Sequence, residues 1–186
     1  MEEAIKRMMD EHIAVSNDTK NLSAGIAKAA NLIVECLRNN GKVLVMGNGG
    51  SATQASHFAA ELVGRYKKER KGYPCIALNT DIAILTAVGN DYGFENVFSR
   101  QVEALAKKGD VLIGLSTSGN SANVIRAIEK AKEIGCKTIT LTGNDGGKIR
   151  NVNVNINIGS KNTPRIQEMH IMILHIIAEI AEEVLK

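Results

Sequence analysis

The first forty residues carry apolar positions at the spacing of a helix. A first segment, from about residue 2 to 16, predicts a helix with one apolar side made of Ile5, Met8, Met9 and Ile13. A second segment, from about residue 19 to 40, repeats the i, i+3, i+4 spacing and stops at Asn40-Gly41. The chain therefore begins with two amphipathic helices.

Beyond residue 41 the pattern changes to short apolar runs that alternate with helical segments. Strands are predicted at 42–46, 75–78, 110–115, 137–141 and 152–158, the last with strict alternation typical of an edge strand. Helices are predicted at 51–65, 81–88, 94–107 and 120–134. Continuous apolar strands between helices indicate an α/β fold with a mainly parallel sheet covered on both faces.

The last predicted helix, about 164–185, is apolar around nearly its whole circumference. Such a helix is buried on all sides. We expect part of its surface to meet another subunit, in a helical oligomer core shared with the N-terminal helices of residues 1–40. The alternative is a central helix in the core of a single chain.

Composition is that of one globular domain over residues 1–186, with 44% hydrophobic and 23% charged residues. Aromatic residues make up 3%, so a base-stacking nucleic-acid surface is poorly supplied and no nucleic-acid partner is expected. The basic run 65–71 is interpreted as a solvated helix end. The alternative is that Arg65, which is close enough to the preceding glycine loop, reaches an anionic ligand.

The expected compartment is the cytoplasm. The three cysteines are isolated among apolar neighbours, which favours buried thiols in a reducing environment: Cys36, Cys75 and Cys136. The N-terminus is charged from its second residue, unlike a signal peptide. No apolar run reaches the roughly 18 residues that a membrane span needs, so no membrane partner is expected.

A glycine-rich loop, Gly47-Asn-Gly-Gly-Ser51, follows the first strand. Its glycines let the backbone approach a ligand, and the helix that follows favours an anion. With Ala52 it matches the GxGxxA dinucleotide fingerprint, which expects an acid about 20 residues later at a strand end. Glu69 lies in the basic run and Asp81 comes some ten residues late, so dinucleotide binding is disfavoured.

A serine-rich loop, Ser116-Thr-Ser-Gly-Asn-Ser121, follows the third strand. It offers four hydroxyls and the free N–H groups of a helix start, whereas an ordinary helix cap needs one hydroxyl. This predicts a phosphate site, and the hydroxyls belong to Ser116, Thr117, Ser118 and Ser121. In a third loop, Gly89–Gly93, Asn90 and Asp91 are equally consistent with sugar contacts and with simple turn residues.

The candidate acid–base groups are histidines and glutamates on two predicted helices. His57 and Glu61 are spaced i, i+4 on the helix after the glycine loop, which suits a metal site, proton transfer or a plain surface pair. The last helix carries Gln167, His170 and His175. Their spacing does not decide which of the two histidines joins the site.

These residues lie in stretches that resemble the phosphoheptose isomerases of the SIS (sugar isomerase) family along nearly the whole chain. The stretches are KVLVMGNGGSATQASHFAAELVGRY, VGNDYGFENVFSR, GDVLIGLSTSGNSANVIRAI, TITLTGNDGGK and RIQEMHIMILHI. The resemblance implies a five-stranded parallel SIS sheet, a flavodoxin-like three-layer sandwich, and a homotetramer with active sites between subunits.

The same resemblance implies an intramolecular aldose–ketose isomerase that converts sedoheptulose 7-phosphate to D-glycero-D-manno-heptose 7-phosphate, the first step toward the ADP-heptose of lipopolysaccharide. Carried over residue by residue, it assigns the phosphate to the serine loop and catalysis to Glu61 and His175. Sugar contacts are implied at Asn48, Gly49, Gly50, Ser51, Glu61, Asn90, Asp91 and Gln167. One zinc ion per subunit is implied at His57, Glu61, Gln167 and His175, although glutamine is an uncommon zinc ligand.

Two alternative functions are compatible with the same fold but involve no isomerisation. A close SIS relative binds the bacterial replication initiator and regulates initiation of DNA replication, and the stretch ALNTDIAILTA resembles that protein as well. It lacks counterparts of Glu61 and His175 and has STRGNS where this chain has STSGNS, which favours an enzyme here. A phosphosugar sensor usually carries a separate DNA-binding domain, for which 186 residues leave no room.

Overall fold

The computed structural model describes residues 1–149 and 151–185. The helices are α1 (Glu2–Thr19), α2 (Ser23–Arg38), α3 (Gly50–Val63), α4 (Ile82–Tyr92), α5 (Ser99–Leu105), α6 (Ala122–Ile134) and α7 (Thr163–Val184), with short 3-10 turns η1 (Lys20–Leu22) and η2 (Phe94–Asn96). The strands are β1 (Val43–Gly47), β2 (Cys75–Ala77), β3 (Val111–Ser116), β4 (Lys137–Gly143) and β5 (Val154–Ile158).

The strands form one parallel sheet in the order β2-β1-β3-β4-β5, so the predicted five-stranded parallel sheet is confirmed. β1 and β3 are neighbours near its centre, and Gly47 at the end of β1 pairs with Leu115 at the end of β3. The loops that follow these two strands therefore leave the same edge of the sheet side by side. The chain order reverses between them, and in open parallel sheets ligands bind at such a point.

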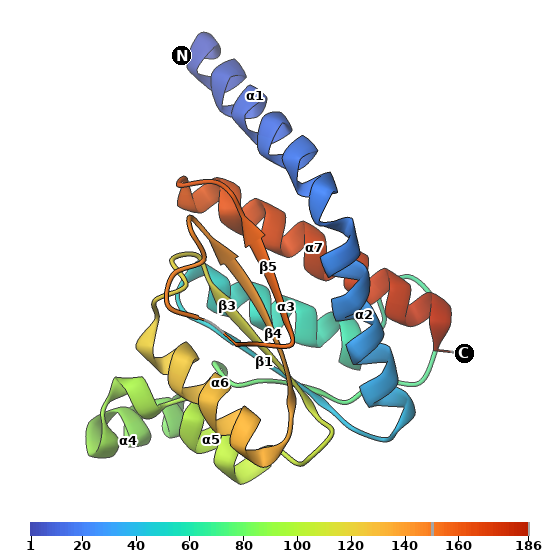
Figure 1. The fold of residues 1–186 in the computed structure, drawn as a ribbon, viewed down its shortest axis with the longest axis vertical. Helices are drawn as coiled ribbons and strands as arrows, with labels where there is room; N and C mark the ends of the chain where they lie inside the picture. The colour runs from blue at the N-terminus through green and yellow to red at the C-terminus, as the bar shows by residue number, and fades with distance from the viewer. Residues whose placement is uncertain (150, 186) are drawn as a thin grey trace.

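Helices cover both faces of the sheet, which confirms the three-layer sandwich (Figure 1). Successive side chains of a strand point to opposite faces. Val43 and Val45 accordingly enter the core under α2, α3 and α7, and Leu44 and Met46 enter the core under α5 and α6. α2 therefore packs into the chain's own core.

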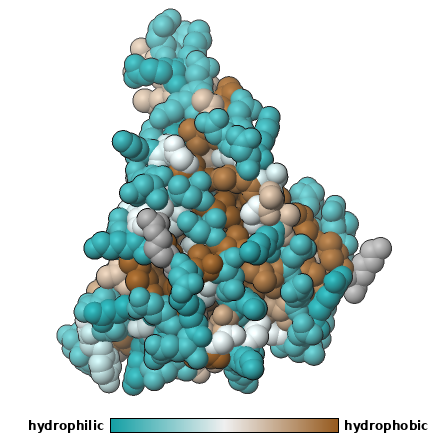
Figure 2. Space-filling model, viewed as in Figure 1, coloured by the Kyte–Doolittle hydropathy of each residue, from teal (hydrophilic) through white to brown (hydrophobic). Residues whose placement is uncertain are grey.

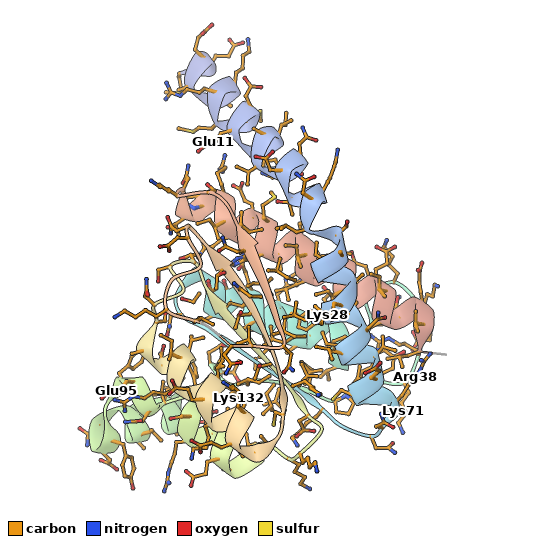
Figure 3. All side chains as sticks on the ribbon, viewed as in Figure 1. Glu11, Lys28, Arg38, Lys71, Glu95 and Lys132 are labelled. Atoms are coloured by element: carbon orange, nitrogen blue, oxygen red, sulfur yellow. The ribbon has the colours of Figure 1, made fainter. Side chains whose placement is uncertain are left out.

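Helix α1 projects beyond the rest of the chain, and its contacts are made with one end of α7 (Figure 1). Two residues labelled in Figure 3 contact the ends of α7: Glu11 of α1 at its start and Arg38 of α2 at its end. Glu11 accepts hydrogen bonds of 3.0 Å from the side chain of Asn162, and Arg38 donates one of 3.1 Å to the carbonyl of Val184. Both ends of α7 are thus tied to the N-terminal helices.

The edge strand β5 alternates as predicted, with Val154, Ile156 and Ile158 buried. Its asparagines form a polar ladder with the buried threonines of β4. Thr142 Oγ lies 2.9 Å from the Oδ1 of both Asn155 and Asn157. The ladder supplies partners for threonine hydroxyls that are cut off from water.

Two of the predicted boundaries around residue 90 are wrong. The segment 81–88 continues as α4 to Tyr92, so Asn90 and Asp91 lie in the last helical turn instead of a loop. Gly89 adopts an ordinary helical φ, and the left-handed φ of 88° that ends the helix comes first at Gly93. The segment 94–107, predicted as one helix, is divided into η2 and α5.

The cysteines are buried and free, as predicted. Burial is the main cause that raises the pKa of Cys36 and Cys136 to about 11 and that of Cys75 to about 12. These thiols stay protonated and inert at neutral pH. No helix in the described part of the chain is long and apolar enough to cross a membrane.

Candidate active site

The serine loop joins β3 to α6 at the carboxyl edge of the sheet, where Ser118 is exposed and Thr117 and Ser121 are partly exposed. Ser121 is the N-cap residue of α6, but its side chain caps no backbone N–H. Its Oγ lies instead 2.9 Å from Oγ of the buried Ser116. In the first turn of α6, the N–H of Val124 donates at 2.9 Å to the Oδ1 of Asn123. The Ser121 hydroxyl takes up none of the donors, and the partial positive charge of this helix end favours an anion.

Gly119 sets the shape of this loop. Its φ is +64°, and a β-carbon there would lie 2.1 Å from the carbonyl oxygen of Gly146 in the β4–β5 loop. The carbonyl of Gly119 accepts backbone hydrogen bonds of 2.9 Å from Lys148 and 3.1 Å from Ile149. The close approach of the two loops requires glycine at 119 and makes the serine loop rigid.

The serine loop and the glycine loop are joined by a pair of side-chain amides. Asn48 Nδ2 donates to Asn123 Oδ1 at 2.9 Å, and Asn123 Nδ2 donates back to Asn48 Oδ1 at 2.8 Å. The pair fixes Asn48, a predicted sugar contact. Asn123 itself was not predicted, because in the sequence it is only a polar residue near the start of a predicted helix.

The glycine loop leads from β1 into α3, whose first turn holds Ser51 in a buried position. Gly49 has a φ of +56°. A β-carbon at Gly50 would lie 2.8 Å from Nε2 of Gln167, so the amide of α7 packs directly on the loop backbone. Gln54 donates at 2.7 Å to the carbonyl of Gln167, which joins the start of α3 to α7.

Further along, α3 and α7 bring together the two halves of the predicted acid–base site. His57 Nε2 lies 2.9 Å from Glu61 Oε1 and 3.0 Å from His175 Nε2. One ligand atom from each of the three residues lies within 4.8 Å of the others. The structure thus joins His57 and Glu61 with His175 and selects it over His170.

His170 has a different place in the fold. Its ring is fully buried, and Nε2 donates at 3.0 Å to the carbonyl oxygen of Thr142 at the end of β4. Nδ1 is buried without a hydrogen-bond partner. Burial is the main cause that lowers the pKa of His170 to about 4, so the ring is neutral at physiological pH.

The cluster of His57, Glu61 and His175 has the donor set of a divalent metal site. Two imidazole nitrogens at 3.0 Å cannot both present lone pairs to each other, so a proton or a cation must lie between them. Two imidazoles and one carboxylate suit zinc, which also accepts a fourth ligand. Gln167, two helical turns from His175 or about 12 Å along the axis, contacts the glycine loop at the other end of the α3–α7 contact.

Asn90 and Asp91 lie exposed at the end of α4. Asn90 Nδ2 donates to Asp91 Oδ1 at 2.8 Å, so each side chain has the other as its partner. Their role as sugar contacts stays a prediction.

The sequence suggested that the basic run 65–71 is a solvated helix end. The run follows the end of α3 at Val63 and most of its residues are exposed, but Arg70 departs from this prediction. Arg70 has a side chain 10% exposed that pairs at 3.1 Å with Glu182, which is 2% exposed. Arg65 is solvated, with a side chain 61% exposed. In the same segment the ring of Tyr66 lies with its centre 5.7 Å from that of His175, so the run closes one side of the acid–base cluster.

Comparison with known proteins agrees with this geometry. The sequence profile of the SIS domain family matches residues 9–143, more than half of the chain. The phosphoheptose isomerase of Aliarcobacter butzleri is 54% identical over 179 residues, which cover 96% of this chain and 95% of that protein.

Solved structures of phosphoheptose isomerases superpose over nearly their whole length. The enzyme of Neisseria gonorrhoeae has a TM-score of 0.92 at 43% identity, with 98% of each chain covered. That of Francisella tularensis has a TM-score of 0.94 at 39% identity, with 97% of each chain covered. The chain belongs to the phosphoheptose isomerase family of SIS domain proteins.

Proposed function

We propose that this protein converts sedoheptulose 7-phosphate to D-glycero-D-manno-heptose 7-phosphate, the entry step toward ADP-heptose for lipopolysaccharide. The names of relatives above 50% identity support this reaction. The observation that carries it is the 4.8 Å cluster of His57, Glu61 and His175, since the helix of His57 and Glu61 starts at the glycine loop that Asn48 joins to the serine-loop helix. A phosphate site alone would serve a sensor equally well, whereas the cluster supplies an acid and a base.

The serine loop is proposed to hold the phosphate. The hydroxyls of Ser116, Thr117, Ser118 and Ser121 and the N-terminus of α6 together offer the donors that a dianion needs. The sugar chain would then run past Asn48, Gly49 and Gly50, with Gln167, Asn90 and Asp91 as further hydroxyl contacts. In this pose the reacting carbons reach the cluster between α3 and α7.

Isomerisation is proposed to run through an enediol. Glu61 takes the proton from C1 of the ketose and returns it to C2, while His175 gives a proton to the oxygen on C2 and takes one from the oxygen on C1. Each of the two groups serves adjacent carbons, which their separation within 4.8 Å permits. Positioned acid–base groups of this kind typically contribute about 10²–10⁴-fold each.

His57 is proposed to orient both groups, because its Nε2 contacts both of them. Zinc is the cofactor proposed for this set, held by His57, Glu61 and His175, and it would supply Lewis acidity toward the substrate oxygens. Gln167, the fourth ligand that the resemblance implies, packs on the glycine loop and would have to turn toward the cluster to join it. Glu61 cannot be a tight metal ligand and a free base in one state. We place direct acid–base catalysis first.

A homotetramer in the cytoplasm is proposed as the working form. The apolar side of α1 is half exposed in the single chain, with exposed fractions of 48–61% for Ile5, Met8, Met9 and Ile13. Figure 2 shows hydrophobic side chains gathered along α7 beside α2. A groove there of about 430 Å³ is lined by Ile26, Met172, Ile176 and Ile180. Exposed apolar surface of this extent favours contact with other copies of the chain.

The test is an isomerase assay with sedoheptulose 7-phosphate, with and without a chelator followed by zinc. Wild type is expected to turn over, Glu61→Gln and His175→Ala are expected to lose about 10²–10⁴-fold in kcat, and Glu69→Gln, whose side chain is 91% exposed, is expected to match wild type. Absence of turnover with and without zinc would refute the isomerase. Full activity of either site variant would refute the assigned roles.

A further inference from the structure

A buried carboxylate near the end of α7 organises the segment that follows α3. Glu182 accepts hydrogen bonds from three successive backbone N–H groups, those of Tyr66 at 3.0 Å and of Lys67 and Lys68 at 2.8 Å each. It also pairs at 3.1 Å with Nε of Arg70. Four donors on one carboxylate, with its side chain 2% exposed, make a closed polar cluster.

Glu182 is ionised in this cluster. Burial alone would raise its pKa, but the hydrogen bonds from Lys67, Lys68 and Tyr66, together with the charge of Arg70, outweigh burial and lower the pKa below its ordinary value.

Arg70 connects this polar cluster to α3, the helix that holds Glu61. Its guanidinium donates to the carbonyl oxygens of Glu61 at 2.8 Å and of Leu62 at 2.9 Å. These are carbonyls of the last turn of α3, which have no partner within the helix. The guanidinium also lies 3.9 Å over the ring of Tyr73. The end of α3 is therefore fixed to α7 through Arg70 and Glu182.

Tyr66 connects the same cluster to His175. Its backbone N–H is held by Glu182, and its ring lies 5.7 Å from the ring of His175, tilted by 35°. The ring of His57 contacts His175 at a centre-to-centre distance of 5.0 Å. His175 thus has two rings as neighbours, one on α3 and one on the segment that follows α3.

We propose that Glu182 is a positioning residue of the active site: through the segment 65–72 it holds Tyr66 against His175 and holds the last turn of α3 that carries Glu61. This inference rests on the proposed function, in which Glu61 and His175 are the acid–base pair. Glu182 lies seven residues beyond His175, about 10 Å along the helix, and acts only through its neighbours. Displacements of about 1 Å in catalytic groups cost on the order of 10²-fold in rate.

The experiment compares Glu182→Gln with Glu183→Gln, a matched change one residue further on an exposed side chain. Glu182→Gln is expected to lower kcat by about 10- to 100-fold while KM stays within about twofold, because the serine and glycine loops lie at the other end of α3. Glu183→Gln is expected to match wild type.

Variants of Tyr66 separate positioning from general loss of stability. Tyr66→Phe keeps the ring and is expected to retain wild-type kcat, whereas Tyr66→Leu loses the ring contact and is expected to fall part of the way to Glu182→Gln. The double variant Glu182→Gln/Tyr66→Leu is expected to fall no further than Glu182→Gln alone, because Glu182→Gln already releases the ring contact that Tyr66→Leu removes.

A second readout is independent of turnover. In Glu182→Gln the NMR shifts of the His175 ring protons are expected to move toward those of Tyr66→Leu, since the tyrosine ring is present but displaced. A folded Glu182→Gln with wild-type kcat and wild-type His175 shifts would overturn the inference. If Glu182→Gln does not fold, equal kcat in Tyr66→Leu and Tyr66→Phe would overturn it. If wild type has no isomerase activity, the proposed function fails, and the shifts alone decide the positioning.

Discussion

The buried His170 makes the stability of this fold depend on pH in the mildly acidic range. Its ring lies wholly inside the protein, fixed by the bond to the carbonyl of Thr142, and its pKa is about 4 against an ordinary value of 6.5. Between these two values the unfolded chain binds a proton that the folded chain does not. Stability from this group is complete above pH 6.5 and is lost as pH falls toward 4.

The magnitude follows from the two pKa values. Proton linkage gives a loss of about 2 kcal/mol in the free energy of unfolding between pH 8 and pH 5, rising to roughly 3 kcal/mol at pH 4. Replacing His170 with glutamine removes the titration and keeps an N–H donor near the position of Nε2. The amide introduced by His170→Gln is neutral at every pH, so this variant is expected to lack this part of the pH dependence.

The assay is urea unfolding of wild type and His170→Gln at pH 8 and pH 5, at one protein concentration and with chelator present. Equal concentrations matter because association stabilises the folded chain. The rest of the chain is the same in the two proteins, so its contribution to the pH dependence cancels in the comparison. Wild type is expected to lose about 2 kcal/mol more than the variant. Equal losses in the two proteins would refute the claim that His170 is held neutral by burial.

Other predictions follow from single contacts. Gly119→Ala is expected to weaken binding of inorganic phosphate by about tenfold or more, measured by calorimetry. The left-handed φ costs about 1 kcal/mol for alanine, and the new β-carbon would clash with the carbonyl oxygen of Gly146. Unchanged affinity would argue against the phosphate loop. Asn123→Ala leaves Asn48 without its partner and is expected to lower the free energy of unfolding by about 1–3 kcal/mol, measured in urea. Met8→Glu is expected to yield smaller species in sedimentation velocity, and a wild-type mass would exclude α1 from the interface.

The features that depend only on residues close together in the sequence were predictable from it. The strands β1 and β3 are continuous apolar runs, because strands covered on both faces need apolar side chains on both. The serine loop was predictable for a similar reason. Its hydroxyls and the helix start that a phosphate needs fall within six consecutive residues, so no distant segment has to be known.

Contacts between distant segments were not predictable in this way. Asn123 and Asn48 are 75 residues apart and meet only because β1 and β3 are neighbours in the sheet. Glu182 is one of several glutamates near the end of α7. Glu182 differs from the others because the segment 65–72 folds over that end of the helix and donates hydrogen bonds to it. The charges of this segment predict solvation, and only the fold shows that the Arg70 side chain is 10% exposed.

The two histidines of α7 show what the sequence alone could not determine. It placed both on one apolar helix, five residues apart, which separates them by about 140° around the axis. Which side chain joins Glu61 depends on which neighbour lies on each side of the helix. In the folded chain α3 lies beside His175 and the end of β4 beside His170, so one ring meets His57 and the other a backbone carbonyl. The spacing along the chain determined the angle between the two rings, and only tertiary packing gave each ring its partner.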